Sequence, residues 1–87
     1  MTEREVIVGH RLGLHARAAA RVVQLSSQFT CAIVLLRDDG GKKIEADARS
    51  ILSILFLAAA PGCALVVRAD GVGEGEAVDC ICEYLKG

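Results

Sequence analysis

The sequence predicts a single α+β domain, residues 1–87, in which three helices cover one face of a four-stranded sheet. Three observations lead to this prediction. The chain of 87 residues is too short for two full domains but long enough to bury a core. Hydrophobic residues make up 53% of it and aromatic residues only 3%, which favours an aliphatic core. Strand-like and helix-like segments follow the order β-α-β-β-α-β-α, and this order favours one sheet with all helices packed on one of its faces.

The first part of the chain is expected to form a strand, a loop, a helix and a second strand. The β-branched run at residues 5–8 predicts the first strand, and a loop with two glycines follows over residues 9–14. Apolar residues recur at helical spacing over residues 16–27, which predicts an amphipathic helix. A nearly continuous apolar run predicts the second strand over residues 31–36.

Turn signals separate the remaining elements. An Asp-Gly turn predicts a hairpin. Residues 42–47 alternate polar and apolar side chains, which predicts the return strand with one face exposed to solvent. Residues 49–59 have a helix-forming composition that ends before a Pro-Gly pair. Residues 63–69 predict the last strand. The final helix is expected over residues 74–86, with glutamates in its first turn, where the helix dipole favours negative charge.

Charge and composition exclude several classes of function. With 10 Lys and Arg against 11 Asp and Glu, the net charge of −1 gives no general attraction to nucleic acid or anionic membranes. The apolar run 51–60 is too short to cross a bilayer, and residues 1–5 contain acids where a signal peptide is positively charged. We therefore expect a cytoplasmic protein that neither binds nucleic acid nor inserts into a membrane.

The four cysteines are expected to be free thiols. They are Cys31, Cys63, Cys80 and Cys82. They contain no Cys-x-x-Cys pair, and both histidines lie far from them in the sequence, so a zinc site has no support. We expect neither a metal nor an organic cofactor.

His15 stands where the glycine-containing loop meets the start of a predicted helix. The first N–H groups of a helix lack partners within the helix and bind phosphate readily, and Arg17 adds a fixed cation. Neutral imidazole attacks phosphorus without a separate base, so His15 is a candidate site for reversible phosphoryl transfer. A helix cap without any chemical role fits this local pattern equally well. We expect His10, in contrast, to be a solvent-exposed loop residue.

Two motifs resemble the signatures of the HPr family, the phosphocarriers of the phosphoenolpyruvate-dependent sugar phosphotransferase system. Gly13-Leu14-His15-Ala16-Arg17 resembles the active-site motif of that family. Arg49-Ser50-Ile51-Leu52 resembles the stretch that opens its second helix. The resemblance extends over nearly the whole chain. It implies the open-faced β-sandwich of that family, with a four-stranded antiparallel sheet.

The resemblance also implies roles for the matching residues. His15 would accept a phosphoryl group on Nδ1 from enzyme I, which phosphoenolpyruvate charges, and would pass it to a IIA component. Arg17 would neutralise the phosphoryl oxygens, and the N–H groups of Ala16 and Arg17 would complete the cradle. Ser50 would be a candidate for regulation by a serine kinase/phosphorylase, although helix capping is its ordinary structural role. The protein would then be a monomeric carrier in a relay rather than a self-contained enzyme.

An apolar docking patch is expected beside His15. The helix that begins near Ser50 carries more apolar side chains than one sheet can bury, so some should stay exposed and meet partner proteins. The candidates are Ile51, Leu52 and Leu55. The alternative is that all three belong to the core. Three arginines could surround the patch and attract acidic partners, namely Arg17, Arg21 and Arg49.

Two positions depart from the pattern of the HPr family. Ala18 stands in place of a proline, and Leu12 in place of a small polar residue. Proline in the first helical turn fixes φ, so its absence should reduce the preorganisation of the helix start and leave the chemistry intact. The opening Arg11-Leu12-Gly13 is more similar to the nitrogen-related regulatory branch of the family. That branch and a small non-catalytic interaction domain are the alternatives to sugar transport.

Overall fold

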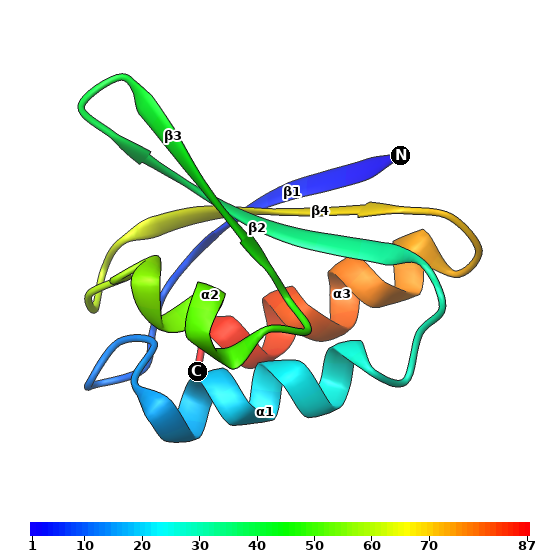
Figure 1. Ribbon diagram of the computed structural model, residues 1–87, viewed down its shortest axis with the longest axis horizontal. Coiled ribbons are helices and arrows are strands. Elements are labelled where there is room, and N and C mark those ends of the chain that lie inside the picture. The colour runs from blue at the N-terminus through cyan, green and yellow to red at the C-terminus, as the bar shows by residue number, and fades with distance from the viewer.

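The computed structural model describes residues 1–87 and contains the elements in the predicted order (Figure 1). The strands are β1 (Thr2–Ile7), β2 (Ala32–Asp39), β3 (Lys42–Asp47) and β4 (Ala64–Asp70), and the helices are α1 (Ala16–Ser26), α2 (Ile51–Phe56) and α3 (Glu74–Leu85). The strand order in the sheet is β1-β4-β2-β3, and every neighbouring pair is antiparallel.

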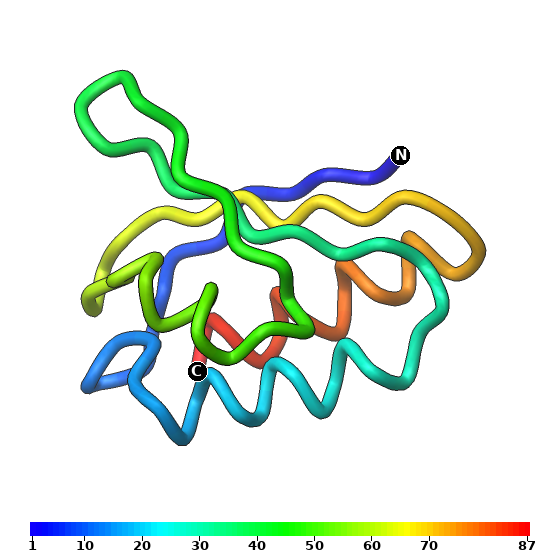
Figure 2. Tube along the Cα trace, viewed as in Figure 1, coloured from blue at the N-terminus to red at the C-terminus, as the bar shows by residue number.

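All three helices lie on one face of the sheet, so the predicted open-faced sandwich is confirmed (Figure 1). The hairpin of β2 and β3 extends beyond the rest of the sheet, as the Cα trace in Figure 2 shows. Arg68 lies on the uncovered face and forms ion pairs with Glu3 of β1 and Glu45 of β3. None of the helices has the length and hydrophobicity that crossing a membrane requires.

The helix α2 is shorter than the sequence predicts. It begins at Ile51 because Ser50 caps it, with the Ser50 hydroxyl accepting a hydrogen bond from the N–H of Ser53. It ends at Phe56, and two residues later Ala58 adopts a left-handed backbone with φ of 53°. A residue in this conformation turns the chain out of the helix, so the expected extension to residue 59 is wrong.

The core is aliphatic, as the composition predicts, and lies between the sheet and the helices. Alternate residues of β4, such as Leu65 and Val67, are fully buried on the helical face. Ile81 of α3 and Val22 of α1 are also fully buried in this core. Burying one such side chain contributes about 1.5–3 kcal/mol to the stability of the fold. Burial of side chains from the helices against the sheet therefore holds the helices in place.

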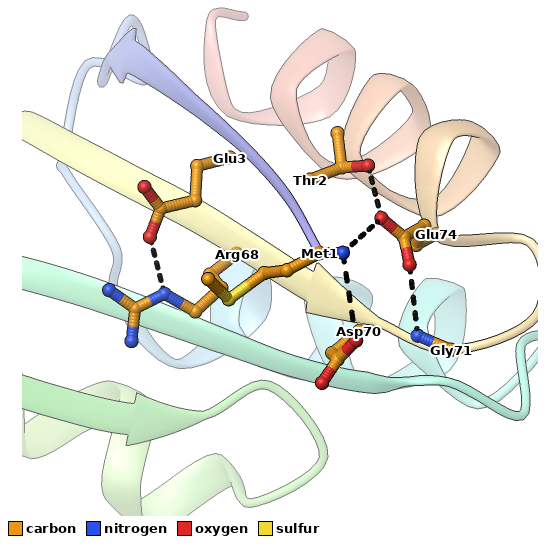
Figure 3. Close-up of polar contacts among 7 residues, drawn as sticks. All are labelled: Met1, Thr2, Glu3, Arg68, Asp70, Gly71 and Glu74. Carbon is orange, nitrogen blue, oxygen red and sulfur yellow. Dashed lines mark hydrogen bonds and ion pairs between the residues drawn. The ribbon is translucent and has the colours of Figure 1, made fainter.

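The start of β1 is tied to the start of α3 by the carboxylate of Glu74 (Figure 3). This carboxylate accepts a hydrogen bond from the hydroxyl of Thr2 at 2.6 Å and one from the N–H of Gly71 at 3.2 Å. It also forms an ion pair with the amino group of Met1 at 2.9 Å. The Thr2 hydroxyl, the amino group and the Gly71 N–H together lower the pKa of Glu74 to about 2.

Candidate functional site

The loop between β1 and α1 is held against two other segments of the chain. The N–H of Gly9 donates to the carbonyl of Leu85 at 2.9 Å, and the N–H of Leu14 donates to the carbonyl of Ala59 at 2.9 Å. These bonds attach the loop to the C-terminal end of α3 and to the segment after α2. The residue that follows this loop, His15, therefore stands on a fixed backbone.

Gly13 allows the loop to approach the segment after α2. Its φ is 69°, in the left-handed region that favours glycine. A Cβ at this position would lie 2.4 Å from the carbonyl oxygen of Ala59 and 3.1 Å from the Cα of Ala60. Only glycine fits this close approach without displacing backbone atoms.

His15 is the N-cap of α1, and its Nδ1 atom faces the helix. The backbone of His15 is extended, with φ of −77° and ψ of 179°, and its carbonyl accepts the N–H of Ala19 at 2.8 Å. Nδ1 accepts a hydrogen bond from the N–H of Arg17 at 3.2 Å. An accepting nitrogen carries a lone pair, so the proton of the neutral ring lies on Nε2. The arrangement leaves on Nδ1 the electron pair that a nucleophile needs.

No acidic side chain in the first turn of α1 offsets the positive end of the helix dipole beside this nitrogen. The N–H groups of Ala16 and Ala18 have no partner within the helix. The side chain of Arg17 is exposed and takes part in none of the ion pairs of the chain. An anionic group on Nδ1 would therefore meet unpaired donors and a free guanidinium group.

A hollow of about 490 Å³ opens beside His15 and joins the loop to the end of α3. It is lined by His10, Leu12, His15, Arg17, Ala18 and Tyr84. Our expectation of a solvent-exposed His10 is wrong, because its ring is half-buried and its Nε2 lies 2.7 Å from the carbonyl oxygen of Tyr84. Tyr84 follows His10 by 74 residues, and no local pattern in the sequence indicates their contact.

The apolar side chains of α2 are exposed to different degrees. Ile51, Leu52 and Leu55 are 39%, 64% and 37% exposed, whereas Ile54 is fully buried. The alternative that all three expected patch residues belong to the core is therefore excluded. Phe56 is 80% exposed and was not among the candidates, although it follows Leu55 directly. The same helix thus anchors itself through one face and presents an apolar surface on another.

Arg49 does not belong to a basic rim around this surface, contrary to our expectation. Its Nη2 donates to the backbone carbonyls of Ser26 at 2.9 Å and Cys31 at 2.8 Å, and also to that of Phe29. The guanidinium group thereby covers the C-terminal end of α1 and the chain that leads into β2. Arg21, in contrast, is exposed and bonds only to the side chain of Gln24.

The comparison with protein families decides to which family this site belongs. Residues 2–87 match the model of the PTS HPr component phosphorylation site. The chain belongs to the HPr family. Its relatives include the phosphocarrier protein HPr of Xylella fastidiosa, which is 41% identical over 99% of this chain and 92% of the relative. The phosphocarrier protein NPr of Proteus mirabilis is 35% identical over 90% of this chain and 83% of the relative.

The HPr fold is also evident in solved structures. The crystal structure of a phosphocarrier protein HPr from Bacillus anthracis matches with a TM-score of 0.85 and 31% identity. The match covers 97% of this chain and 95% of the other. Similarity to both HPr and NPr proteins establishes the HPr/NPr phosphocarrier family of the phosphotransferase system.

The cysteines of this HPr-family chain are all free, with Cys31 and Cys82 buried and Cys63 and Cys80 half-buried. Burial raises the pKa of the Cys82 thiol, which makes it a poor nucleophile at neutral pH. No group of three or more His, Cys, Asp and Glu side chains comes together to hold a metal ion.

Proposed function

We propose that this chain is a phosphoryl carrier in which Nδ1 of His15 accepts a phosphoryl group from enzyme I and passes it to a IIA component. Enzyme I would in turn be charged by phosphoenolpyruvate. The observation that carries the proposal is the hydrogen bond from the N–H of Arg17 to Nδ1, which keeps a lone pair on that nitrogen at the helix start. Membership of the HPr family supports the same assignment.

The chemistry follows from the state of the imidazole ring. The lone pair on Nδ1 forms the new bond to phosphorus while the bond between phosphorus and the donor breaks, and the donor keeps that electron pair. The N–H of Arg17 is then free to donate to a phosphoryl oxygen, together with the N–H of Ala16 and the Arg17 guanidinium group. Because Nε2 keeps its proton, the phosphorylated ring is cationic and leaves readily when the IIA component attacks.

The exposed apolar side chains of α2 are proposed as the docking patch for both partners. A carrier that meets a donor and an acceptor in turn must release each of them, which favours a small interface. Ile51, Leu52 and Leu55 offer apolar area near the start of α2, and their partial exposure supports this role. We infer a monomer that uses one surface for successive partners.

Ser50 is proposed as a regulatory site next to that patch. Its hydroxyl is half-buried and accepts the N–H of Ser53 at 3.3 Å. A phosphate on this hydroxyl would add negative charge beside Ile51 and oppose the docking of an acidic partner. A serine kinase/phosphorylase would be the enzyme that adds and removes it.

A second candidate is the nitrogen-related branch, in which phosphorylation of His15 regulates other proteins and does not drive sugar uptake. The opening Arg11-Leu12-Gly13 favours it, and an NPr protein is among the relatives of this chain. The chemistry at His15 is the same in both branches, and only the IIA partner differs. Comparing the rates of transfer to a sugar-type and a nitrogen-type IIA protein separates them.

The test of the carrier function uses labelled phosphoenolpyruvate, enzyme I and the purified chain. We expect label that is lost in acid and retained in base, and its transfer to a IIA protein. The variant His15→Ala should take up no label, whereas Ser50→Ala, the control, should be labelled like the unchanged chain. Absence of label on the unchanged chain, or label that survives in His15→Ala, would overturn the proposal.

A further inference from the structure

We propose that His10 is a positioning residue for His15, because its imidazole fastens the loop that leads to His15 onto the C-terminal end of α3. The inference rests on the proposed function, since it gives His10 a part in phosphoryl transfer at His15. His10 itself would accept no phosphoryl group.

The side chain of His10 has two contacts with a single residue of α3. Its Nε2 lies 2.7 Å from the carbonyl oxygen of Tyr84, and because a carbonyl oxygen only accepts, Nε2 carries the hydrogen. The two rings also pack against each other, with centroids 4.6 Å apart and planes inclined by 46°. One hydrogen bond and one ring contact together fix the imidazole in a half-buried position.

The backbone of His10 connects this anchor to the turn before His15. The carbonyl of His10 accepts the N–H of Gly13 at 2.9 Å, which closes the turn over residues 10–13. Gly13 is the residue that lies against the carbonyl of Ala59 and whose left-handed φ favours glycine. His10 therefore joins the end of α3 to the part of the loop that sets the position of His15.

The neighbouring residue makes the same attachment through its backbone. The N–H of Gly9 donates to the carbonyl of Leu85, and a Cβ on Gly9 would lie 1.9 Å from the carbonyl oxygen of Lys86. The loop and the end of α3 are thus in direct contact at two consecutive residues, and both lie at the same end of the molecule in Figure 2. Removal of the His10 side chain would leave only the backbone part of this attachment.

His10 and His15 line the same hollow, so a change at His10 alters the surroundings of the reacting ring. The hollow also contains Arg17 and Tyr84. Without the imidazole of His10, the loop gains freedom and the wall beside Tyr84 is lost. The reacting nitrogen depends on its alignment with the N–H of Arg17, and small displacements of reacting groups cost large factors in rate, up to about 100-fold for 1 Å.

Two variants separate a positioning role from a merely structural one. His10→Leu keeps the bulk of the side chain and removes the donor to Tyr84. His10→Gln keeps an N–H donor of comparable reach. For both variants and the unchanged chain, we would measure phosphoryl acceptance from phosphorylated enzyme I, the free energy of unfolding, and the ¹⁵N resonances of the His15 ring without phosphate.

For His10→Leu we expect phosphoryl acceptance at saturating enzyme I to fall about tenfold, with KM changed less than about twofold. The His15 ¹⁵N resonances should move toward those of a free histidine, because the hydrogen bond from Arg17 weakens. His10→Gln should restore most of the rate and most of the resonance positions. A normal rate and unchanged ¹⁵N resonances in folded His10→Leu would overturn the proposal, as would a His10→Gln variant as impaired as His10→Leu.

Failure of the proposed function is distinguishable from failure of this inference. If the unchanged chain accepts no phosphoryl group from enzyme I, the proposed function is wrong. The ¹⁵N resonances of His15 still test the positioning role in that case, since they are recorded without phosphate. Movement of these resonances in His10→Leu and their return in His10→Gln would support it, and their constancy in both variants would refute it.

Discussion

Removing the guanidinium group of Arg49 should destabilise the fold strongly, although Arg49 is the first residue of a motif that resembles a family signature. Its Nη2 atom contacts the carbonyls of Ser26, Phe29 and Cys31. Ser26 is the last residue of α1, and Cys31 stands directly before β2. Arg49→Leu would remove the charged donor from these three carbonyl groups at the junction between helix and sheet, and only that of Ser26 is known to keep another donor, the N–H of Phe29 at 3.2 Å.

The size of the effect follows from the number of hydrogens available. One guanidinium nitrogen carries two hydrogens, so three carbonyls share about two full hydrogen bonds. A hydrogen bond from a charged donor contributes about 1.5–3 kcal/mol, and water replaces part of this where the carbonyls are only partly buried. We expect Arg49→Leu to lower the free energy of unfolding by about 2–4 kcal/mol. At roughly 4–8 °C per kcal/mol for a domain of this size, Tm should fall by roughly 8–32 °C.

Urea and thermal unfolding monitored by circular dichroism would measure this loss. Arg21→Leu is the matched control, because Arg21 is exposed and bonds only to Gln24, and it should change the free energy of unfolding by less than about 0.5 kcal/mol. Phosphoryl transfer should show the reverse order of effects. KM for enzyme I should be unchanged in folded Arg49→Leu and raised in Arg21→Leu. Stability of Arg49→Leu within about 0.5 kcal/mol of the unchanged chain would refute this account of the three contacts.

Three further substitutions test other parts of the structure. Gly13→Ala places a Cβ 2.4 Å from the Ala59 carbonyl oxygen at a left-handed φ. It should lower the free energy of unfolding in urea by at least about 2 kcal/mol and slow phosphoryl acceptance. An unchanged free energy of unfolding would contradict the described loop. Ser26→Ala removes a buried hydroxyl that has no hydrogen-bond partner, so the free energy of unfolding in the same assay should be unchanged or raised by up to about 1.5 kcal/mol. A clear decrease in the free energy of unfolding would show that the hydroxyl has a partner. The pKa of Glu74 is lowered from 4.5 to about 2, mainly by the Thr2 hydroxyl, so its carboxylate stabilises the fold above pH 4.5 and this contribution is lost as the pH falls toward 2. Glu74→Gln should therefore flatten the decrease in unfolding free energy between pH 5 and pH 2.5, and an unchanged slope would show that other groups cause it.

The order of the elements and the place of His15 could be predicted because both depend on local patterns. Side-chain periodicity distinguishes helices from strands over a few residues, and a glycine-containing loop followed by a helix-forming run predicts that His15 stands at the start of a helix. No sequence pattern shows which ring nitrogen of His15 carries the lone pair. The hydrogen bond from the N–H of Arg17 identifies it as Nδ1.

The contacts of Arg49 and His10 could not be predicted, because each depends on residues brought together by the fold. Arg49 reaches carbonyl groups 18 to 23 residues away, and its charge alone favoured an exposed position. His10 meets Tyr84 across 74 residues of sequence. The length of α2 could not be predicted for a different reason. Ala58 adopts a left-handed backbone that alanine rarely takes, so the helix-forming composition around it indicates too long a helix.

The most direct test of the carrier mechanism is the position of the phosphoryl group on the phosphorylated chain. Nuclear magnetic resonance of ¹⁵N-histidine-labelled protein, after exposure to enzyme I and phosphoenolpyruvate, distinguishes the two ring nitrogens of His15. The structure predicts a bond from phosphorus to Nδ1 with the hydrogen kept on Nε2. A phosphoryl group on Nε2, on His10 or on a hydroxyl group would contradict the account.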